Sequence, residues 1–351
     1  MSFLWLDALA KTYPGGTQAV KRVDLSIAAG EFVVLLGPSG CGKTTTLRMI
    51  AGLETPSAGR VELAGRDVTR LAPAQRDVGF VFQFYALYPH MSVAENIAFP
   101  LLCSRMARAE REQAVAKVAQ RLGLSGLLGR RPRELSGGDQ QRVGLARAMV
   151  RRPAAWLMDE PLGTLDSDQR GEMCEFLRAQ QLEARVATVY VTHDQEEAMR
   201  LADRVVVMSK GEILQAAPPS EVYDEPATLF VARFVGSPGM NLIEGDAEGH
   251  FFRPRACDER IELPLAVPDG PCVLGARPEF LRREARGPLR ARIVLDAFHG
   301  ACRYLHADAA CGRLVARAGA EQGSAAGEEA RFSIEPAGLR LFDPASGRRI
   351  A

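Results

Sequence analysis

The residues best suited to chemistry form a glycine-rich segment directly after the apolar run 33–36: Gly37-Pro38-Ser39-Gly40-Cys41-Gly42-Lys43-Thr44-Thr45. This segment, here called the phosphate loop, fits the pattern G-x-x-x-x-G-K-[ST] between a predicted strand and a predicted helix. Glycines let backbone N–H groups surround phosphate oxygens, and the start of a helix adds partial positive charge. Lys43 can reach the β- and γ-phosphates of a nucleotide, and the Thr44 hydroxyl can ligate Mg²⁺. The pattern predicts nucleotide binding, with a glycine-rich turn that binds nothing as the alternative.

An acidic pair ends the apolar run Ala155-Trp156-Leu157-Met158. Asp159, at the end of a predicted strand, can hold Mg²⁺ directly or through water. Glu160 follows it and can polarise the water that attacks a γ-phosphate. The alternative is a pair of solvated carboxylates at a strand terminus. The upstream phosphate loop favours the catalytic interpretation.

A third segment, Leu135-Ser136-Gly137-Gly138-Asp139-Gln140-Gln141-Arg142, precedes a helical pattern that runs through Ala148. A serine and two glycines at a helix start make a second anion-binding N-terminus. One chain with two such loops and one acidic pair suggests that the second loop serves the nucleotide of another subunit. Taken alone, Ser136 is better explained as an ordinary helix N-cap.

Elements of two kinds must position these residues. Up to about residue 235, short apolar runs alternate with helical patterns, which is typical of α/β architecture. We expect buried strands at 33–36, 78–82, 155–158, 188–191 and 205–208 and a helix at 109–122. From about Asn241 the helical signal fades, and strands separated by Gly and Pro are expected at 251–252, 261–263, 291–295 and 331–334. The expected domains are an α/β domain over 1–235, with a helical subdomain at about 84–155, and an all-β domain over 236–351 joined through Gly236-Ser237-Pro238-Gly239.

Composition excludes several classes of protein. The chain has 351 residues, 47% of them hydrophobic and 25% charged, which is an ordinary globular composition. With 44 Lys and Arg against 43 Asp and Glu, it lacks the basic excess of a dedicated nucleic-acid binder. Its seven cysteines include no CxxC pair, so we expect reduced thiols in an intracellular protein. No apolar stretch reaches the roughly 20 residues that span a bilayer.

Together these segments strongly resemble the ATP-binding subunits of ABC transporters, essentially from end to end. The phosphate loop, the signature segment Leu135–Arg142 and the acidic pair occur in the family's order. Four further matches accompany them: Lys11-Thr12-Tyr13, Gln83 at a strand end, Leu165-Asp166 and Thr192-His193-Asp194. The fold that the resemblance implies is an α/β P-loop ATPase with a helical subdomain, followed by a smaller all-β, OB-like domain.

The resemblance also implies roles for these residues, with ATP and Mg²⁺ as cofactors. In this family two ATPase domains close head to tail around two ATP molecules. Gly37 to Thr45 would hold the phosphates and Tyr13 would stack on adenine. Ser136, Gly137, Gly138 and Asp139 would face the γ-phosphate held by the opposite chain. The implied catalytic set is Lys43, Gln83, Glu160 as the base and His193, and the implied metal set is Thr44, Gln83 and Asp159. Tyr13 as an ordinary exposed aromatic and Gln83 as an ordinary strand-end residue remain alternatives.

Two positions depart from the family pattern. The residue after Gly138 is usually Gln, whereas Asp139 places a carboxylate near a bound polyanion. We expect a weakened contact with the opposite nucleotide, or else a capping role for Asp139 in its helix. The loop after the acidic pair usually reads Ser-x-Leu-Asp, and here it reads Gly163-Thr164-Leu165-Asp166, without the serine hydroxyl. Cys41 in the phosphate loop is expected to be a reactive thiol, because Lys43 and a helix start lower a thiol pKa.

A narrower resemblance is to importers of carbohydrates and glycerol phosphate. It rests on residues 83–93, on Phe234-Val235-Gly236-Ser237-Pro238-Gly239-Met240-Asn241, and on a tail with Gly275-Ala276-Arg277-Pro278-Glu279. In that family Phe84 through Met91 help to receive a short coupling helix from the membrane subunit. The β-rich domain pairs with its copy or receives regulatory proteins.

The partners implied are a second ATPase subunit, two transmembrane permease subunits and, indirectly, an extracytoplasmic solute-binding protein, with no nucleic acid. The second subunit would be a second copy, with a heterodimer as the alternative. The implied location is peripheral, on the cytoplasmic face of the bacterial inner membrane. The implied solute is a sugar, polyol or glycerol 3-phosphate, and a polyamine, iron or another ion is the alternative. A non-transport ABC ATPase is disfavoured, because no coiled-coil insertion, large basic surface or second cassette is present.

Overall fold

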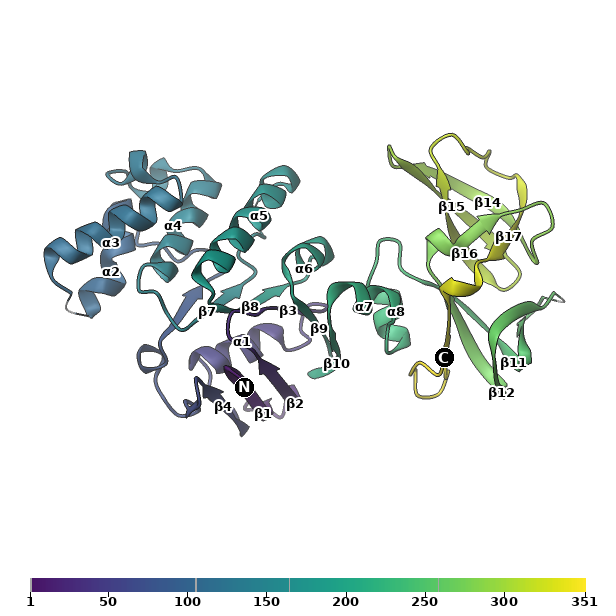
Figure 1. The fold of residues 1–351 in the computed structure, drawn as a ribbon, viewed down its shortest axis with the longest axis horizontal. Coiled ribbons are helices and arrows are strands. Elements are labelled where there is room, and N and C mark those ends of the chain that lie inside the picture. Colours follow the sequence, from purple (N-terminus) through teal and green to yellow (C-terminus); the bar gives the residue numbers. More distant parts are fainter. Residues whose placement is uncertain (1, 105, 164, 258) are drawn as a thin grey trace. The chain divides into compact units, whose positions relative to one another are not determined.

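The computed structural model describes residues 2–104, 106–163, 165–257 and 259–351. The chain divides into two compact units, Met1–Pro219 and Ser220–Ala351 (Figure 1). The first is an α/β unit and the second is mostly β. The predicted fold class, an α/β unit followed by a β-rich unit, is confirmed.

A ten-stranded sheet forms the frame of the first unit's described part. Its order is β5-β4-β1-β2-β10-β9-β3-β8-β7-β6. Strands β3, β8, β7, β6 and β9 pair in parallel, whereas β1, β2 and β4 pair antiparallel. The strand bounds are β1 Leu4–Thr12, β2 Gln18–Ile27, β3 Phe32–Leu36, β4 Ala58–Leu63, β5 Arg66–Asp67, β6 Val78–Val81, β7 Ala155–Asp159, β8 Ala187–Thr192, β9 Arg204–Ser209 and β10 Glu212–Ala217.

Helices cover the parallel strands on both faces. Helix α1 packs against β2, β7 and β8, while α6 packs against β3, β8 and α5 (Figure 1). The predicted helical subdomain lies between β6 and β7. The helix bounds are α1 Lys43–Ala51, α2 Val93–Cys103, α3 Arg108–Arg121, α4 Gly137–Met149, α5 Ser167–Ala184 and α6 Gln195–Leu201, with short 3-10 turns at Pro73–Gln75, Ser125–Leu127 and Pro132–Glu134.

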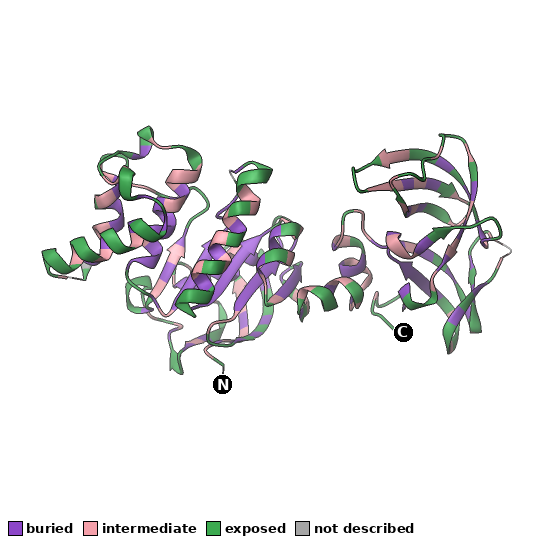
Figure 2. Ribbon diagram, turned by 45° about the horizontal axis from the view of Figure 1, so that its top comes forward, coloured by how far each residue is buried: buried purple, intermediate pink, exposed green. Residues whose placement is uncertain are grey.

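The central strands are buried along their whole length. Every residue of β3, β7 and β8 is buried (Figure 2). Strands covered on both faces are expected to be continuous apolar runs, which is why they were readable in the sequence. The predicted strands at 33–36, 78–82, 155–158, 188–191 and 205–208 correspond to β3, β6, β7, β8 and β9, although β6 ends at Val81, one residue early. The predicted helix at 109–122 is α3.

The second unit contains two β-sheets and two short helices in its described residues. A three-stranded sheet has the order β11-β12-β18, and a five-stranded sheet has the order β13-β17-β14-β15-β16. Because β16 also lies against β13, the five strands curl into a barrel, an architecture that OB folds use. The bounds are α7 Pro219–Asp224, α8 Leu229–Phe234, β11 Asn241–Pro254, β12 Ile261–Ala276, β13 Leu281–Arg283, β14 Leu289–Phe298, β15 Cys302–Ala309, β16 Gly312–Gly319, β17 Glu329–Ile334 and β18 Leu339–Phe342, with 3-10 turns at Pro278–Phe280 and Pro336–Gly338.

The units divide at residues 219 and 220, earlier than the expected boundary at 235 and 236. The side chain of Arg277, 1% exposed, attaches α7 and α8 to the β-sheets. Its guanidinium donates to the carbonyls of Tyr223 (2.7 Å), Ala232 (3.2 Å) and Val235, and it lies 4.0 Å above the Tyr223 ring. These helices therefore belong to the second unit.

No described helix has the length and apolarity that a membrane-spanning helix requires.

Candidate functional site

Four neighbouring parallel strands end at one edge of the sheet, and each is followed by a predicted site segment. In the sheet order these are β3, β8, β7 and β6. The phosphate loop follows β3, His193 follows β8, Asp159 ends β7, and Gln83 comes shortly after β6. Ligands of open α/β sheets bind outside the carboxyl ends of their strands. The topology therefore brings segments from residues 37 to 193 to one site.

The glycines of the phosphate loop allow close backbone approaches. A Cβ on Gly37 would lie 2.3 Å from the Met208 carbonyl oxygen, and one on Gly42 would lie 2.6 Å from that of Ala19. Gly42 is also the N-cap of α1, with a φ of 106° and no side-chain cap bond. Any other residue would be strained there. No N-cap side chain therefore accepts hydrogen bonds from the first N–H groups of α1, so these groups can donate to an anion.

Lys43 is folded into the phosphate loop. Its Nζ donates to the carbonyl oxygens of Gly37 (2.7 Å) and Pro38 (3.0 Å) and lies 3.8 Å from the Cys41 sulfur. The three donors of this ammonium are thus directed at acceptors of the loop itself, two oxygens and a sulfur. The contact of Lys43 with a phosphate stays a prediction. Cys41 itself is 3% exposed, so the structure does not support the expected reactivity of its thiol.

Thr44 and Asp159 form a pair of hard oxygen donors. The Thr44 hydroxyl donates to Asp159 Oδ1 at 2.8 Å. Burial raises the pKa of Asp159, and this hydrogen bond opposes the rise. A desolvated carboxylate beside a hydroxyl is a donor set that suits Mg²⁺. The two residues therefore fit the predicted metal site. Gln83, its third predicted member, donates to Glu160, and its role at the metal stays a prediction.

Glu160 lies between the two polar side chains predicted to accompany it. Its Oε2 is 3.3 Å from Gln83 Nε2 and 3.3 Å from His193 Nδ1. Its backbone has a φ of 44°, uncommon for a residue with a side chain, and its N–H donates to the Val191 carbonyl at 2.9 Å. The carboxylate is thus held by two side chains and a fixed backbone. Strain of this kind is concentrated at functional sites.

A polar network behind His193 was not predicted. Asp194 caps α6 by accepting from the N–H groups of Glu196 (2.8 Å) and Glu197 (3.2 Å), and it accepts from Arg170 at 2.6 Å. The buried Glu197 carboxylate accepts from the Tyr190 hydroxyl at 2.8 Å. The motif Thr192-His193-Asp194 pointed to Asp194. Nothing in the sequence pointed to its partner Arg170, which lies on another helix. This network fixes the backbone that carries His193.

The signature segment begins α4, with Ser136 as its N-cap. The Ser136 hydroxyl accepts from the Asp139 N–H (3.2 Å) and donates to the Asp139 carboxylate (2.7 Å). That carboxylate also pairs with Arg142 at 2.7 Å. The expected free charge at Asp139 is therefore already paired, and Ser136 makes the cap. The hydrogen bonds of Ser136 and Asp139 in the described chain are local, and do not join them to the phosphate loop. In the loop Gly163-Thr164-Leu165-Asp166, which lacks the serine of the family pattern, Thr164 lies outside the described residues.

Tyr13 is half-exposed just after β1. Lys11 lies over its ring at 5.1 Å, and its hydroxyl is 3.5 Å from Glu54. These contacts do not join the ring to the phosphate loop. The adenine role of Tyr13 stays a prediction.

Two further residues that sequence reasoning missed hold the segment after Gln83. Arg147 of α4 donates to the carbonyls of Tyr85 (2.6 Å) and Ala86 (2.7 Å), both of which have positive φ. The buried Asn96 accepts from the Tyr88 N–H (2.8 Å) and donates to three backbone carbonyls nearby. The segment is thus fixed by side chains rather than by regular structure.

Comparison with known sequences identifies close relatives. A family model described as ABC transporter matches residues 20–163. The chain is 46% identical over 366 residues to the sn-glycerol-3-phosphate import ATP-binding protein UgpC of Paraburkholderia xenovorans, covering 99% of each protein. It is also 46% identical over 356 residues to the protein of that name from Paracoccus denitrificans, covering 100% of this chain and 99% of the relative.

Solved structures give the same picture for part of the chain. The bacterial ABC transporter cassette MJ0796, solved as a dimer, is 34% identical with a TM-score of 0.57, covering 62% of this chain and 98% of the other. The cbiO1 protein of Clostridium perfringens, part of the ABC transporter complex cbiONQ, is 27% identical with a TM-score of 0.60, covering 64% and 91%.

Proposed function

The chain belongs to the family of ABC transporter ATP-binding proteins, which are ATPases, and we propose that it energises the import of glycerol 3-phosphate or a related polyol or sugar. The observation that carries the solute class is 46% identity over essentially the full length to glycerol-3-phosphate import ATP-binding proteins. The geometry that supports ATP hydrolysis is the position of Glu160 between Gln83 and His193, beside the phosphate loop.

Each residue at the sheet edge has one task in this proposal. Lys43 and the N–H groups that open α1 bind the phosphates, and Thr44 and Asp159 hold Mg²⁺. Bound Mg²⁺ neutralises phosphate charge. Glu160 accepts a proton from the attacking water, while Gln83 and His193 orient that carboxylate. Ser136 and its neighbours at the start of α4 bind the γ-phosphate of the nucleotide that a second copy holds. Tyr13 stacks on the adenine ring.

The proposed assembly places two copies of the chain on two permease subunits at the cytoplasmic face of the inner membrane. The dimeric state of a solved relative supports the pairing. The exposed Phe84, with 77% of its surface accessible, supports a partner for the segment after Gln83.

The solute is tested by purifying the chain with its permease and binding-protein partners and reconstituting them in vesicles. We expect ATP-dependent accumulation of labelled glycerol 3-phosphate. Accumulation of a polyamine or iron, with no glycerol 3-phosphate, polyol or sugar, would contradict the proposed solute class but leave the ATPase assignment intact.

Replacing Asp139 should strengthen ATP binding in the closed dimer. In Asp139→Asn the charge of Arg142 is no longer paired, and the Ser136 hydroxyl is held less tightly. We expect apparent ATP affinity to rise by about two- to fivefold, equivalent to ~0.5–1 kcal/mol for a partly exposed charge, with a larger gain at low salt. Steady-state ATPase assays at two salt concentrations measure this, with Asp168→Asn as the control. A slower enzyme at every salt concentration would instead make Asp139 a positive part of the site.

Replacing Arg147 should disconnect ATP hydrolysis from the membrane subunits. Without the guanidinium, the Tyr85 and Ala86 carbonyls lose a donor and the segment after Gln83 loses its conformation. For Arg147→Ala we expect ATPase activity of the isolated chain to change less than about twofold, and stimulation by the permease complex to be lost. Arg151→Ala, exposed just beyond α4, is the control. Normal stimulation in Arg147→Ala would show that its contacts do not matter for coupling.

A further inference from the structure

One guanidinium connects two segments of the nucleotide site that come from different parts of the chain. Arg170 lies in the first turn of α5, where its backbone N–H donates to the Asp166 carbonyl at 2.9 Å. Its Nη2 donates to the Leu165 carbonyl at 3.0 Å, and its Nη1 donates to Asp194 Oδ2 at 2.6 Å. Its Nε lies 3.6 Å from Glu197 Oε1. The planar group therefore faces the loop that follows β7 on one side and the segment that follows β8 on the other.

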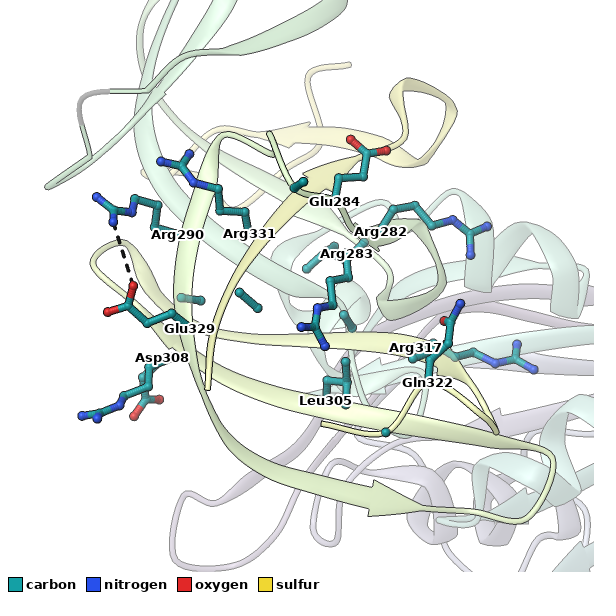
Figure 3. A pocket seen from close by; sticks show the side chains of 18 residues that line it. Arg282, Arg283, Glu284, Arg290, Leu305, Asp308, Arg317, Gln322, Glu329 and Arg331 are labelled. Atoms are coloured by element: carbon teal, nitrogen blue, oxygen red, sulfur yellow. Dashed lines mark ion pairs between the residues drawn. The ribbon is translucent and has the colours of Figure 1, made fainter. Parts of the chain in front are cut away.

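This arrangement differs from the arginine pairs on the surface of the second unit. Figure 3 shows one of them, between Arg290 and Glu329, whose charged atoms are 4.0 Å apart and whose side chains are 66% and 85% exposed. Exposed pairs of this kind contribute little, because water screens them. The side chain of Arg170 is 31% exposed and that of Glu197 is 4% exposed. Arg170 is thus placed to hold its acceptors in a fixed geometry.

The loop that Arg170 holds begins at the proposed catalytic base. The Gly163 N–H donates to the Glu160 carbonyl at 3.3 Å, and the Leu165 N–H donates to the Leu162 carbonyl at 3.1 Å. Two successive turns thus connect Glu160 to Leu165, and the Leu165 side chain is buried. The hydrogen bond from Arg170 to the Leu165 carbonyl therefore fixes the far end of the loop that starts at Glu160.

The carboxylate that Arg170 binds directly follows His193. The Asp194 N–H donates to the Thr192 hydroxyl at 3.0 Å, so the backbone on both sides of His193 is held. Of the two Asp194 carboxylate oxygens, Oδ1 caps α6 and Oδ2 accepts from Arg170. His193 Nδ1 lies 3.3 Å from Glu160 Oε2. The contacts therefore form a closed ring, which runs from Glu160 along its loop to Arg170 and returns through His193.

We propose that Arg170 is a positioning residue for ATP hydrolysis. Its bridge between the two segments fixes where His193 lies relative to Glu160. Arg170 acts through the backbone of these segments and not on the nucleotide itself. This positioning role rests on the proposed roles of Glu160 and His193 in hydrolysis. A misplacement of about 1 Å near reacting groups can cost about 10²-fold in rate. Loss of the bridge should therefore slow hydrolysis, while ATP binding at the phosphate loop is retained.

Steady-state ATPase kinetics of the full chain test the proposal. For Arg170→Gln we expect kcat to fall by about 10- to 100-fold, while the KM for ATP changes less than about twofold. The matched control is Arg178→Gln. Arg178 lies on the same helix, its side chain is 25% exposed, and it pairs with Asp203 (3.1 Å for one of the two contacts), which precedes β9 at the opposite edge of the parallel strands.

Thermal unfolding of both variants shows how much stability each change removes. Arg178→Gln should lose about as much stability as Arg170→Gln, because each removes a half-buried arginine–carboxylate pair, but it should keep the wild-type kcat. An unchanged kcat in Arg170→Gln, or the same loss of kcat in both variants, would overturn the positioning role.

A double-mutant cycle with His193→Ala separates positioning from general stability. Because Arg170 acts through His193, Arg170→Gln should change kcat less than about twofold once His193 is absent. Losses that multiply in the double variant would make Arg170 merely structural and overturn the proposal. A wild-type rate in His193→Ala would overturn the proposed role of His193 together with the positioning role. A slow His193→Ala beside a normal Arg170→Gln would overturn the positioning role alone.

Arg170→Lys provides a second variant in case Arg170→Gln does not fold. The lysine ammonium is a compact point charge that can stay paired with Asp194 but cannot also span to the Leu165 carbonyl. We expect its kcat to lie about three- to tenfold below the wild-type value, at an unchanged KM. A wild-type kcat in Arg170→Lys would show that hydrolysis does not depend on the bridge, and would overturn the proposal.

Discussion

Glu160→Gln is expected to lower the ATPase rate by about 10²- to 10⁴-fold, the usual contribution of a general base. Glutamine keeps the size of the side chain and an oxygen that can accept from Gln83 and His193, but it cannot take a proton from water. ATP binding should persist, because Lys43, Thr44 and Asp159 are unchanged. Single-turnover hydrolysis and a nucleotide-binding titration measure the two effects separately.

The same variant tests the split site. The signature segment makes its described hydrogen bonds locally, so its predicted ligand is the nucleotide of a second copy. Light scattering of Glu160→Gln should show monomers without nucleotide and dimers with ATP and Mg²⁺. Glu175→Gln, exposed on α5, should hydrolyse ATP at the normal rate. A mass that ATP does not change would argue against two chains closing around nucleotide.

Arg277→Leu is expected to destabilise the second unit by roughly 2–6 kcal/mol. The change leaves the carbonyls of Tyr223 and Val235 without the guanidinium donor, whereas the Ala232 carbonyl still accepts from the Met240 N–H at 3.1 Å. Each unsatisfied buried group costs about 1–3 kcal/mol. Loss of the contact with the Tyr223 ring adds to this. The helices α7 and α8 should then separate from the sheets. Thermal unfolding and hydrogen exchange of residues 219–235 measure the effect.

The matched control is Arg282→Gln, whose exposed guanidinium pairs with Glu335 on the surface. Surface pairs contribute about 0–1 kcal/mol, so this variant should unfold near the wild-type temperature. If Arg277→Leu were equally stable, the carbonyls of Tyr223 and Val235 would have to find other donors, and the assignment of α7 and α8 to the second unit would lose its physical basis.

The parallel strands of the core were predictable because a strand buried on both faces is apolar along its whole length. The strands β3, β7 and β8 are apolar throughout, and their ends carry motifs whose spacing is chemically specific. The antiparallel strands β1, β2 and β4 were missed, because polar side chains break up their apolar residues and register shifts interrupt the alternation. A half-buried strand with such breaks resembles a loop in sequence.

Single buried polar residues were also not predicted from the sequence. The buried Arg76 donates to the carbonyls of Met49 and Ile50 at the end of α1, and Arg277 binds carbonyls more than 40 residues away. An arginine in a sequence is interpreted as a surface charge. Its backbone carbonyl partners cannot be recognised, because every residue has a carbonyl. Asp139 is a similar case, because its charge was considered without its partner Arg142.

The point at which the helical segment joins the sheet has a mechanical consequence. The chain leaves the sheet after β6 and returns to it at β7, and these two strands are adjacent and parallel. Residues 82–154 are therefore an arm with both attachments on one side, at a single strand pair. Gln83 lies at the outgoing attachment and Glu160 just beyond the returning strand, so their contact spans the pivot. Because both covalent connections of the arm to the sheet lie here, the Gln83–Glu160 contact ties the catalytic carboxylate to both of them at once.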